Sequence, residues 1–314
     1  MPASPATAFP IGPAPERAGD VAQSRRSPSS ALRAASVGYR VPCAHFDGIA
    51  IAVFTRACYV DCGGGTLLTV GGAAVADGPT NLLLGSDAPA DLRIAFRRGD
   101  SVACRAGVVR WRGTTLDLRR ARIWRAPAPR PPLAWPERIA RGEMAARRLA
   151  FARRARPSVL DRDGEAAVAA VADACRRLDV AATLATAARL VGWGEGLTPA
   201  GDDFLVGLAG ALHALRGGGA LRRAFVARVA AFLSAQRSRT TPFAAHALAL
   251  AATGDFNGDV LRALDALRSE PDARAAERTL SDVLAVGATS GADMLTGMLA
   301  GWTAWTDGGA DGRR

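Results

Sequence analysis

The spacing of apolar residues along the chain changes near residue 125. Before that point, short apolar or alternating runs are separated by turns rich in Gly and Asp, which is the pattern of short β-strands. These runs span 49–54, 66–70, 81–84, 92–96, 108–111 and 114–118. Six or more short strands with regular turns predict a small barrel or sandwich.

Beyond residue 133 the pattern is helical, and alanine, the strongest helix former, dominates it. The predicted helices span 136–154, 165–190, 199–215, 221–236, 242–252, 259–268, 273–286 and 291–303. We therefore predict an α+β protein, in which a small N-terminal β-barrel or sandwich-like domain precedes an all-helical C-terminal domain.

A proline-rich linker over 126–133 marks the predicted domain boundary, because proline at this density ends strands and helices and acts as a stiff spacer. On its two sides we expect a β-rich domain over 36–125 and a helical domain over 134–308. The ends of the chain, 1–35 and 309–314, are expected to be a disordered leader and tail. The leader has no continuous apolar stretch and the cysteines are odd in number, which favours a cytoplasmic protein with reduced cysteines.

The net charge is +11, and every basic residue other than histidine is Arg. The absence of Lys excludes Schiff-base lysines and the P-loop lysine. Twelve Arg against two Glu make the segment 119–156 strongly basic. This segment is either a solvated helix face with the linker, or a docking surface for an acidic partner or nucleic acid. No recognition motif supports nucleic acid, and no apolar run is long enough for a membrane span.

The densest signal for chemistry is Gly-Trp-Gly-Glu-Gly-Leu-Thr-Pro-Ala-Gly-Asp-Asp at 192–203, directly before an apolar helix. Thr198 is a good N-cap and Pro199 a good first helical residue, and the helix start offers free N–H groups to an anion. A P-loop is excluded, because Asp202 stands where the lysine should be. The predicted anion-binding residues of this segment are Gly194, Gly196, Thr198, Gly201 and Asp202.

The sequence pattern at the start of this helix is repeated ninety residues later in the chain. The segments 200–207 and 290–297 share the pattern small-Gly-x-Asp-apolar-Leu-x-Gly. Gly207 and Gly297 predict a close crossing of the two helices, with the ends that carry Asp203 and Asp293 together. We predict these two carboxylates as the catalytic groups. The simpler alternative is that each Asp only complements the dipole of its own helix.

Two further helix starts contribute candidates. Arg239, Thr240 and Thr241 precede Pro242 and repeat the Thr-Pro cap, while Ser290 and Gly291 open the second Gly-Asp helix. All five are predicted to bind substrate or an anion, with Arg237 assisting Arg239 as a forked clamp. His246 follows just over one turn into its helix, where a single histidine is more often a core or surface residue than a catalytic one.

The segments 194–205 and 286–297 resemble the signature of the AllH-like family, long catalogued as a domain of unknown function. The strand-rich N-terminal half is also similar, so that the resemblance covers about residues 37–302. The family includes one subunit of bacterial oxamate carbamoyltransferase, an enzyme of allantoin breakdown that needs two other kinds of subunit. That enzyme interconverts oxalurate plus phosphate with oxamate plus carbamoyl phosphate. The resemblance implies a transferase subunit with partner subunits and a small anionic substrate.

Two hypotheses follow. In the first, the protein is a subunit of a carbamoyltransferase-like enzyme for small ureido or carboxylate anions. Asp203 and Asp293, with Asp202, then hold Mg²⁺, the candidate cofactor, or orient the carbamoyl nitrogen. In the second, it is a non-catalytic ligand-binding or scaffold subunit of a multi-protein metabolic complex. The lack of a catalytic His, Cys or Lys constellation in the sequence favours the second.

Overall fold

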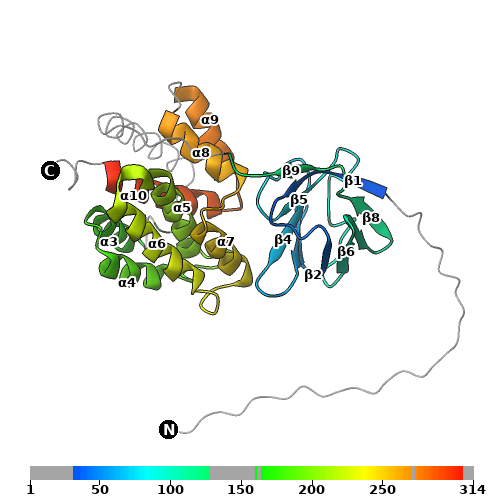
Figure 1. Ribbon diagram of the computed structural model, residues 1–314, viewed down its shortest axis with the longest axis horizontal. Helices are drawn as coiled ribbons and strands as arrows, with labels where there is room; N and C mark the ends of the chain where they lie inside the picture. The colour runs from blue at the N-terminus through cyan, green and yellow to red at the C-terminus, as the bar shows by residue number, and fades with distance from the viewer. Residues whose placement is uncertain (1–30, 128–159, 161–163, 270–272, 307–314) are drawn as a thin grey trace, which may run out of the picture.

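The computed structural model describes residues 31–127, 160, 164–269 and 273–306. Figure 1 shows strands in one part of the molecule and helices in the other. Each part has its own hydrophobic core, one built from residues between Ala34 and Leu118 and the other from residues between Leu160 and Trp305. The predicted α+β arrangement, with strands first and helices second, is confirmed.

The strands form a sheet that closes on itself. They are β1 (Ala31–Gly38), β2 (His45–Val53), β3 (Ala57–Asp61), β4 (Leu67–Gly71), β5 (Asn81–Leu84), β6 (Ser101–Arg105), β7 (Val108–Trp111), β8 (Thr114–Asp117) and β9 (Arg122–Trp124). The order is β5-β4-β3-β2-β6-β7-β8-β1-β9, and β1 pairs with β5 as well, with Val37 opposite Leu82. This closure makes the β-rich part a barrel rather than a sandwich.

The structure contains four strands that the predicted runs do not include, β1, β3, β6 and β9, and it has no strand at one of the predicted runs. Strand β1 begins at Ala31, inside the predicted leader, because its small residues gave no apolar signal. The predicted strand over 92–96 is wrong. The N–H of Phe96 donates to the carbonyl of Leu92 (2.9 Å), as in a helical turn, and Phe96 stacks on Trp111 with ring centres 4.4 Å apart. Leu92 and Phe96 are four residues apart, so one turn points both into the barrel core.

The helical part contains eight described α-helices. They are α3 (Glu165–Arg176), α4 (Val180–Leu190), α5 (Ala200–Leu215), α6 (Ala220–Ser234), α7 (Pro242–Ala252), α8 (Gly258–Ser269), α9 (Ala273–Leu284) and α10 (Ser290–Thr306). The single helix predicted over 165–190 is two helices. Leu178 has a positive φ of 55°, and Asp179 then caps α4 by accepting the N–H of Ala182 (2.9 Å).

Several expectations fall on residues outside the described part of the chain. These are the helix over 136–154, most of the basic segment 119–156 and most of the linker 126–133. Within the described residues, no helix combines the length and the hydropathy that crossing a membrane requires.

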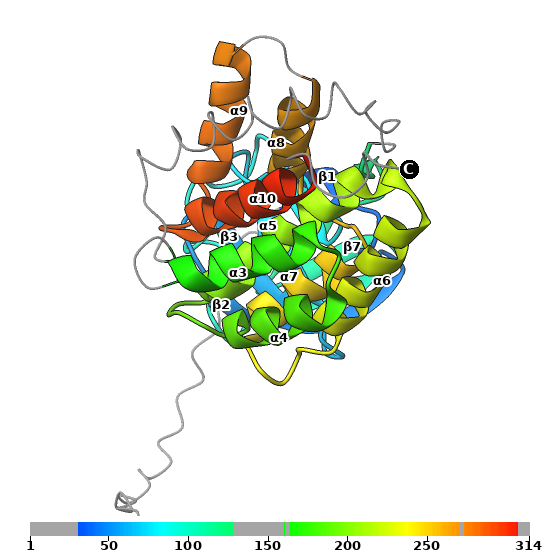
Figure 2. The same ribbon diagram turned by 90° about the vertical axis from the view of Figure 1, so that its left-hand side faces the viewer.

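Helices α5 and α10 cross at the two glycines that the sequence pattern singled out. A Cβ added to Gly207 would lie 1.9 Å from the carbonyl oxygen of Met294, and a Cβ added to Gly297 would lie 1.9 Å from that of Phe204. The two backbones are therefore in direct contact, which confirms the predicted close crossing. Figure 2 shows α10 lying across α5.

The starts of the same helices are equally crowded. A Cβ on Gly201 would lie 2.0 Å from the carbonyl oxygen of Leu190, at the end of α4, and one on Gly291 would lie 2.0 Å from that of Val283, near the end of α9. The pairs α4–α5 and α9–α10 thus repeat the same packing. Both Gly-Asp helix starts are fixed against the helix before them.

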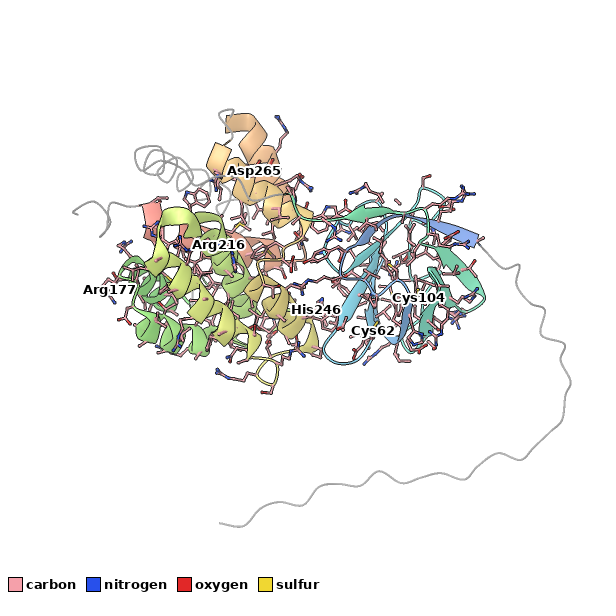
Figure 3. The ribbon with its side chains drawn as sticks, viewed as in Figure 1. Cys62, Cys104, Arg177, Arg216, His246 and Asp265 are labelled. Carbon is pink, nitrogen blue, oxygen red and sulfur yellow. The ribbon has the colours of Figure 1, made fainter. Side chains whose placement is uncertain are left out.

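The barrel contacts the helical part mainly at α7 and the loops beside it. His246 Nε2 lies 3.1 Å from the hydroxyl oxygen of Thr80, and the N–H of Leu67 donates to its Nδ1 (3.4 Å). Arg237 donates to the carbonyl of Gly64 (2.9 Å). Figure 3 shows His246 on the side of the helical part that faces the barrel.

A second set of contacts joins the residues that follow β1 to the residues that follow α7. The hydroxyl of Tyr39 donates to Asp255 (2.8 Å), and Arg40 forms an ion pair with the same carboxylate. Arg40 also donates to the hydroxyl of Thr253 (2.9 Å). These bonds hold the barrel against the segment that follows α7.

Candidate active site

The loops before α5 and α7 are joined by hydrogen bonds. The carboxylate of Asp202 accepts the N–H of Gly192 (3.1 Å) at Oδ1 and the hydroxyl of Thr240 (2.5 Å) at Oδ2. The hydroxyl of Thr241 donates to the carbonyl of Leu197, and its oxygen also caps α7. Asp202, Thr240 and Thr241 therefore fix the two loops, and the buried carboxylate of Asp202 has protein partners at both oxygens.

Asp203 and Asp293 lie in the first turns of the crossing helices α5 and α10. Their side chains are deeply buried, since the residues are 4% and 0% exposed. The hydroxyl oxygens of Thr198 and Ser290, one from each loop, are 2.9 Å apart, and both hydroxyls hydrogen-bond to Asp203. The structure thus brings Asp203, Asp293, Thr198 and Ser290 together.

Burial raises the pKa of Asp203 to about 7. Hydrogen bonds from Ser290 and Thr198 lower this pKa in part, and the neighbouring charges of Asp293 and Asp202 raise it again. The Oδ2 atom of Asp203 is buried and has no hydrogen-bond partner within the described part of the chain. Asp203 is therefore a carboxyl group that exchanges its proton near neutral pH and has one oxygen available to a ligand.

Tyr59 of β3 belongs to the same region and was missed by the sequence analysis. Its ring packs edge-on against Phe243 of α7 and against Phe54, with ring centres 5.2 and 6.1 Å apart. Burial raises the pKa of its hydroxyl, and the charge of Asp203 raises that pKa further. The barrel therefore contributes a phenol beside the carboxylates. The apolar and alternating runs of the sequence did not include β3, so no signal placed Tyr59 there.

The backbone N–H groups at both helix starts, which were predicted to bind an anion, already donate to carbonyls of the preceding loops. These bonds run from Gly201 to Trp193 (2.9 Å), from Asp203 to Pro199 (3.1 Å), from Gly291 to Val286 (3.1 Å) and from Asp293 to Thr289 (3.0 Å). A ligand at these helix starts would compete with bonds that the chain makes to itself.

Gly194 and Gly196 shape the loop between α4 and α5. Both have positive φ angles, 106° and 97°, which residues with a Cβ rarely adopt. A Cβ on Gly194 would also lie 2.9 Å from the backbone nitrogen of Ala200, whereas the space beside Gly196 is open. These glycines are required by the backbone conformation of the loop, and Gly196 leaves one side of it uncovered.

The two arginines that were expected to clamp an anion have partners elsewhere. Arg239 donates to the carbonyl of Ala188 (2.7 Å) and to the side chain of Gln236 (3.1 Å). Arg237 is bonded to Gly64 of the barrel. Their guanidinium groups hold loops in place.

The three aspartates proposed for Mg²⁺ do not form a cluster of three ligands. Across the described ranges, no group of three or more His, Cys, Asp or Glu side chains is positioned to hold a metal ion. The carboxylate of Asp202 faces Gly192 and Thr240 instead. The ionisable side chains that interact electrostatically with Asp203 include Asp293 and Tyr59.

One comparison with known proteins matches this region to a family model. No curated protein and no solved structure matches the chain. The matched range contains α5 to α9 and most of α10, and it includes every residue that the sequence proposed for the site. The resemblance to the AllH family is confirmed over this range, since residues 190–302 match the family model described as oxamate carbamoyltransferase subunit AllH.

Proposed function

We propose that the protein is a subunit of a carbamoyltransferase that acts on small ureido or carboxylate anions at Asp203 and Asp293. The observation that carries the proposal is the buried carboxylate pair at the crossing of α5 and α10, inside the range that matches the AllH family. The family is named for a subunit, so partner subunits are part of the proposal.

Carbamoyl transfer from carbamoyl phosphate to an amide nitrogen forms a carbon–nitrogen bond and breaks the bond between the carbonyl carbon and the phosphate oxygen. The phosphate leaves with the electron pair, and the attacking nitrogen must lose a proton. A carboxylate with a pKa of about 7 is well suited to take that proton at neutral pH. We assign this role to Asp203.

The second carboxylate has a complementary role. A carbamoyl group carries an –NH₂ whose two N–H bonds need acceptors inside a dry site. Asp293 and the Oδ2 atom of Asp203 supply acceptors, and the charge of Asp293 keeps the pKa of Asp203 raised. The hydroxyls of Thr198 and Ser290 position Asp203, and Tyr59 closes the barrel side of the site.

The test is carbamoyl transfer from carbamoyl phosphate to oxamate, measured with the protein combined with its partner subunits. We expect Asp203→Asn and Asp293→Asn each to lower kcat by about 100-fold or more, because general-base catalysis contributes factors of this size. The double variant should be little worse than either single one, because the two groups act as a unit. The protein alone should show little transfer.

Asp202→Asn is the matched control. It removes the neighbouring carboxylate, which binds the loops before α5 and α7 and has no role in the proposed proton transfer. Its turnover should stay within a few-fold of the wild type. If Asp203→Asn and Asp202→Asn are equally active, the catalytic assignment is wrong.

The alternative is a non-catalytic ligand-binding or scaffold subunit. It is favoured by one specific observation, namely that the helix-start N–H groups and the guanidinium of Arg239 are bonded within the chain. In that case the complex containing Asp203→Asn would still turn over, while calorimetric binding of oxamate to the isolated protein would be lost.

A further inference from the structure

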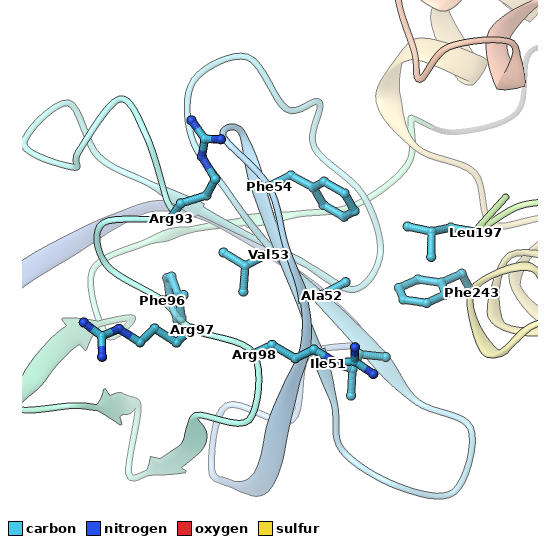
Figure 4. Close-up of a pocket in the computed structure, with 10 residues that line it drawn as sticks. All are labelled: Ile51, Ala52, Val53, Phe54, Arg93, Phe96, Arg97, Arg98, Leu197 and Phe243. Atoms are coloured by element: carbon cyan, nitrogen blue, oxygen red, sulfur yellow. The ribbon is translucent and has the colours of Figure 1, made fainter.

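A cavity of about 590 Å³ opens between the barrel and the helical part (Figure 4). On the barrel side, its walls are residues 51–54, at the end of β2, and the segment 93–98. On the helical side, they are Leu197, in the loop between α4 and α5, and Phe243 of α7. It lies beside the carboxylate site, since Phe243 packs on Tyr59 and Leu197 precedes Thr198. No role has so far been assigned to it.

The walls of this cavity are mainly apolar. Phe54, Phe243 and Leu197 face one another across it in Figure 4, and Val53 and Phe96 lie behind them. Phe54 is 44% and Leu197 42% exposed, which is unusual for large apolar side chains that line a hollow. Covering them with an apolar ligand would contribute about 25 cal/mol for each Å² removed from water.

The cavity also carries positive charge without compensation. Of its three arginines, Arg93 is paired with Asp91 (2.7 Å). The side chains of Arg97 and Arg98 form no ion pair with any residue in the described ranges. Figure 4 shows Arg97 pointing away from the gap, whereas Arg98 extends toward it. Arg98 is therefore the cation that a ligand in the cavity would meet.

We propose that this cavity binds an organic anion with an apolar body, such as an aromatic or branched carboxylate, sulfonate or phosphate ester. The apolar part lies against Phe54, Leu197 and Phe243, and the anionic group contacts Arg98. A guanidinium group is well suited to such oxyanions because of its fixed fork of donors.

This ligand differs from the substrate proposed above. A volume of about 590 Å³ with apolar walls exceeds what an anion of two or three carbons fills. The anionic group of this larger ligand contacts Arg98 rather than the carboxylate pair. The two sites therefore take ligands of different size and apolar character, and the inference stands independently of the proposed carbamoyl transfer.

The experiment uses two fluorescent probes, the aromatic sulfonate 8-anilinonaphthalene-1-sulfonate and the uncharged N-phenyl-1-naphthylamine, with the full-length chain. Arg98→Gln should weaken sulfonate binding about tenfold, the loss of one charge-assisted contact, and leave the neutral probe unchanged. Arg177→Gln is the matched control, because Arg177 directly follows α3, far from the barrel (Figure 3), and should change neither. Ala52→Phe fills the cavity and should weaken both probes.

Circular dichroism and thermal unfolding establish that each variant is folded. Equal sulfonate affinity for Arg98→Gln and Arg177→Gln would overturn the assignment of Arg98. Unchanged binding of both probes to Ala52→Phe would show that the probes do not bind in this cavity. Asp203→Asn should bind both probes like the wild type, so that this experiment and the transfer assay can fail separately.

Discussion

At the scale of single residues, Asp202 and Asp203 are adjacent in the chain but have different surroundings. Both oxygens of Asp202 accept hydrogen bonds from the neighbouring loops, whereas Oδ2 of Asp203 has no such partner among the described residues. Burial raises the pKa of both groups. One carboxylate therefore serves the structure of the loops, and the other is available for chemistry.

The raised pKa of Asp203 predicts how stability depends on pH. Its value is about 7 in the folded protein against an ordinary 3.8, so the folded state holds the proton more tightly than the unfolded state. Ionising the group therefore costs stability as the pH rises from about 4 to about 7. Asp203→Asn cannot ionise. We expect it to exceed the wild type in stability by about 1–4 kcal/mol at pH 8, with the advantage vanishing near pH 4.

Urea unfolding of both proteins at the two pH values measures this difference. Asp202→Asn provides the comparison, since it weakens the bonds that Asp202 accepts from Gly192 and Thr240, a loss of about 1–2 kcal/mol that relief of its own raised pKa offsets in part at pH 8. A stability difference between Asp203→Asn and the wild type that does not change with pH would mean that Asp203 has an ordinary pKa.

At the scale of elements, the crossing of α5 and α10 determines where the carboxylates lie. Because Gly207 and Gly297 let the backbones touch, the first turns of the two helices are brought to the same place. The motif repeat was enough to predict this crossing. The same sequence could not reveal Tyr59, because its five-residue strand was not among the predicted runs and its position depends on the docking of the barrel.

Gly207→Ala tests the crossing. Its new Cβ would lie 1.9 Å from a backbone oxygen, which cannot move unless the helices separate. We expect a loss of about 2–4 kcal/mol in the free energy of unfolding, and Gly297→Ala should behave alike. Urea denaturation measures both.

Gly210→Ala is the matched control on the same buried helix. Its Cβ would meet only side-chain atoms, the nearest being Cδ1 of Leu264 at 3.2 Å. The gain in helix propensity should offset the crowding, so the change in stability should stay within about 1 kcal/mol. Equal effects of the two substitutions would argue that close backbone contact is not what α5 requires.

The strand errors have a related cause. The apolar residues at 92 and 96 suggested a strand, yet their separation of four also fits one helical turn, and only the barrel interior decides between the two. Strand β1 was not predicted because alanine and serine occupy many of its positions and give little apolar signal. Local patterns thus predicted the class of each half, whereas the closure of the barrel depends on pairing between β1 and β5, which are distant in sequence.

At the scale of the whole molecule, the barrel and the helical part share few but specific polar contacts. His246 is central to them, and burial lowers the pKa of its side chain below the ordinary 6.5. The folded state therefore favours neutral His246, and the stability that this contact contributes is present above pH 6.5 and lost as the pH falls below it. This dependence has the opposite sign to that of Asp203.

His246→Gln should remove this loss at low pH. We expect the melting temperature of the wild type to fall more than that of the variant between pH 7.5 and pH 5.5, measured by calorimetry. His45→Gln is the control, because the side chain of His45 is 63% exposed and its ion-pair partner, Asp47, belongs to the barrel. Parallel curves for the wild type and His246→Gln would show that protonation of this histidine does not weaken the docking.

The reciprocal contacts of α5 and α10 also have a consequence for ancestry. Gly207 meets the carbonyl of Met294 just as Gly297 meets that of Phe204, and a contact unchanged by exchanging its two sides is the pattern of a two-fold dimer interface. Here that interface lies within one chain, as fusion of two copies of a shorter helical unit would produce. One ancestral carboxylate would then face its own copy across the axis. In the repeat, Thr198 corresponds to Ala288, and Ser290 corresponds to Ala200. Divergence of the two copies would account for this difference, which places both hydroxyls beside Asp203.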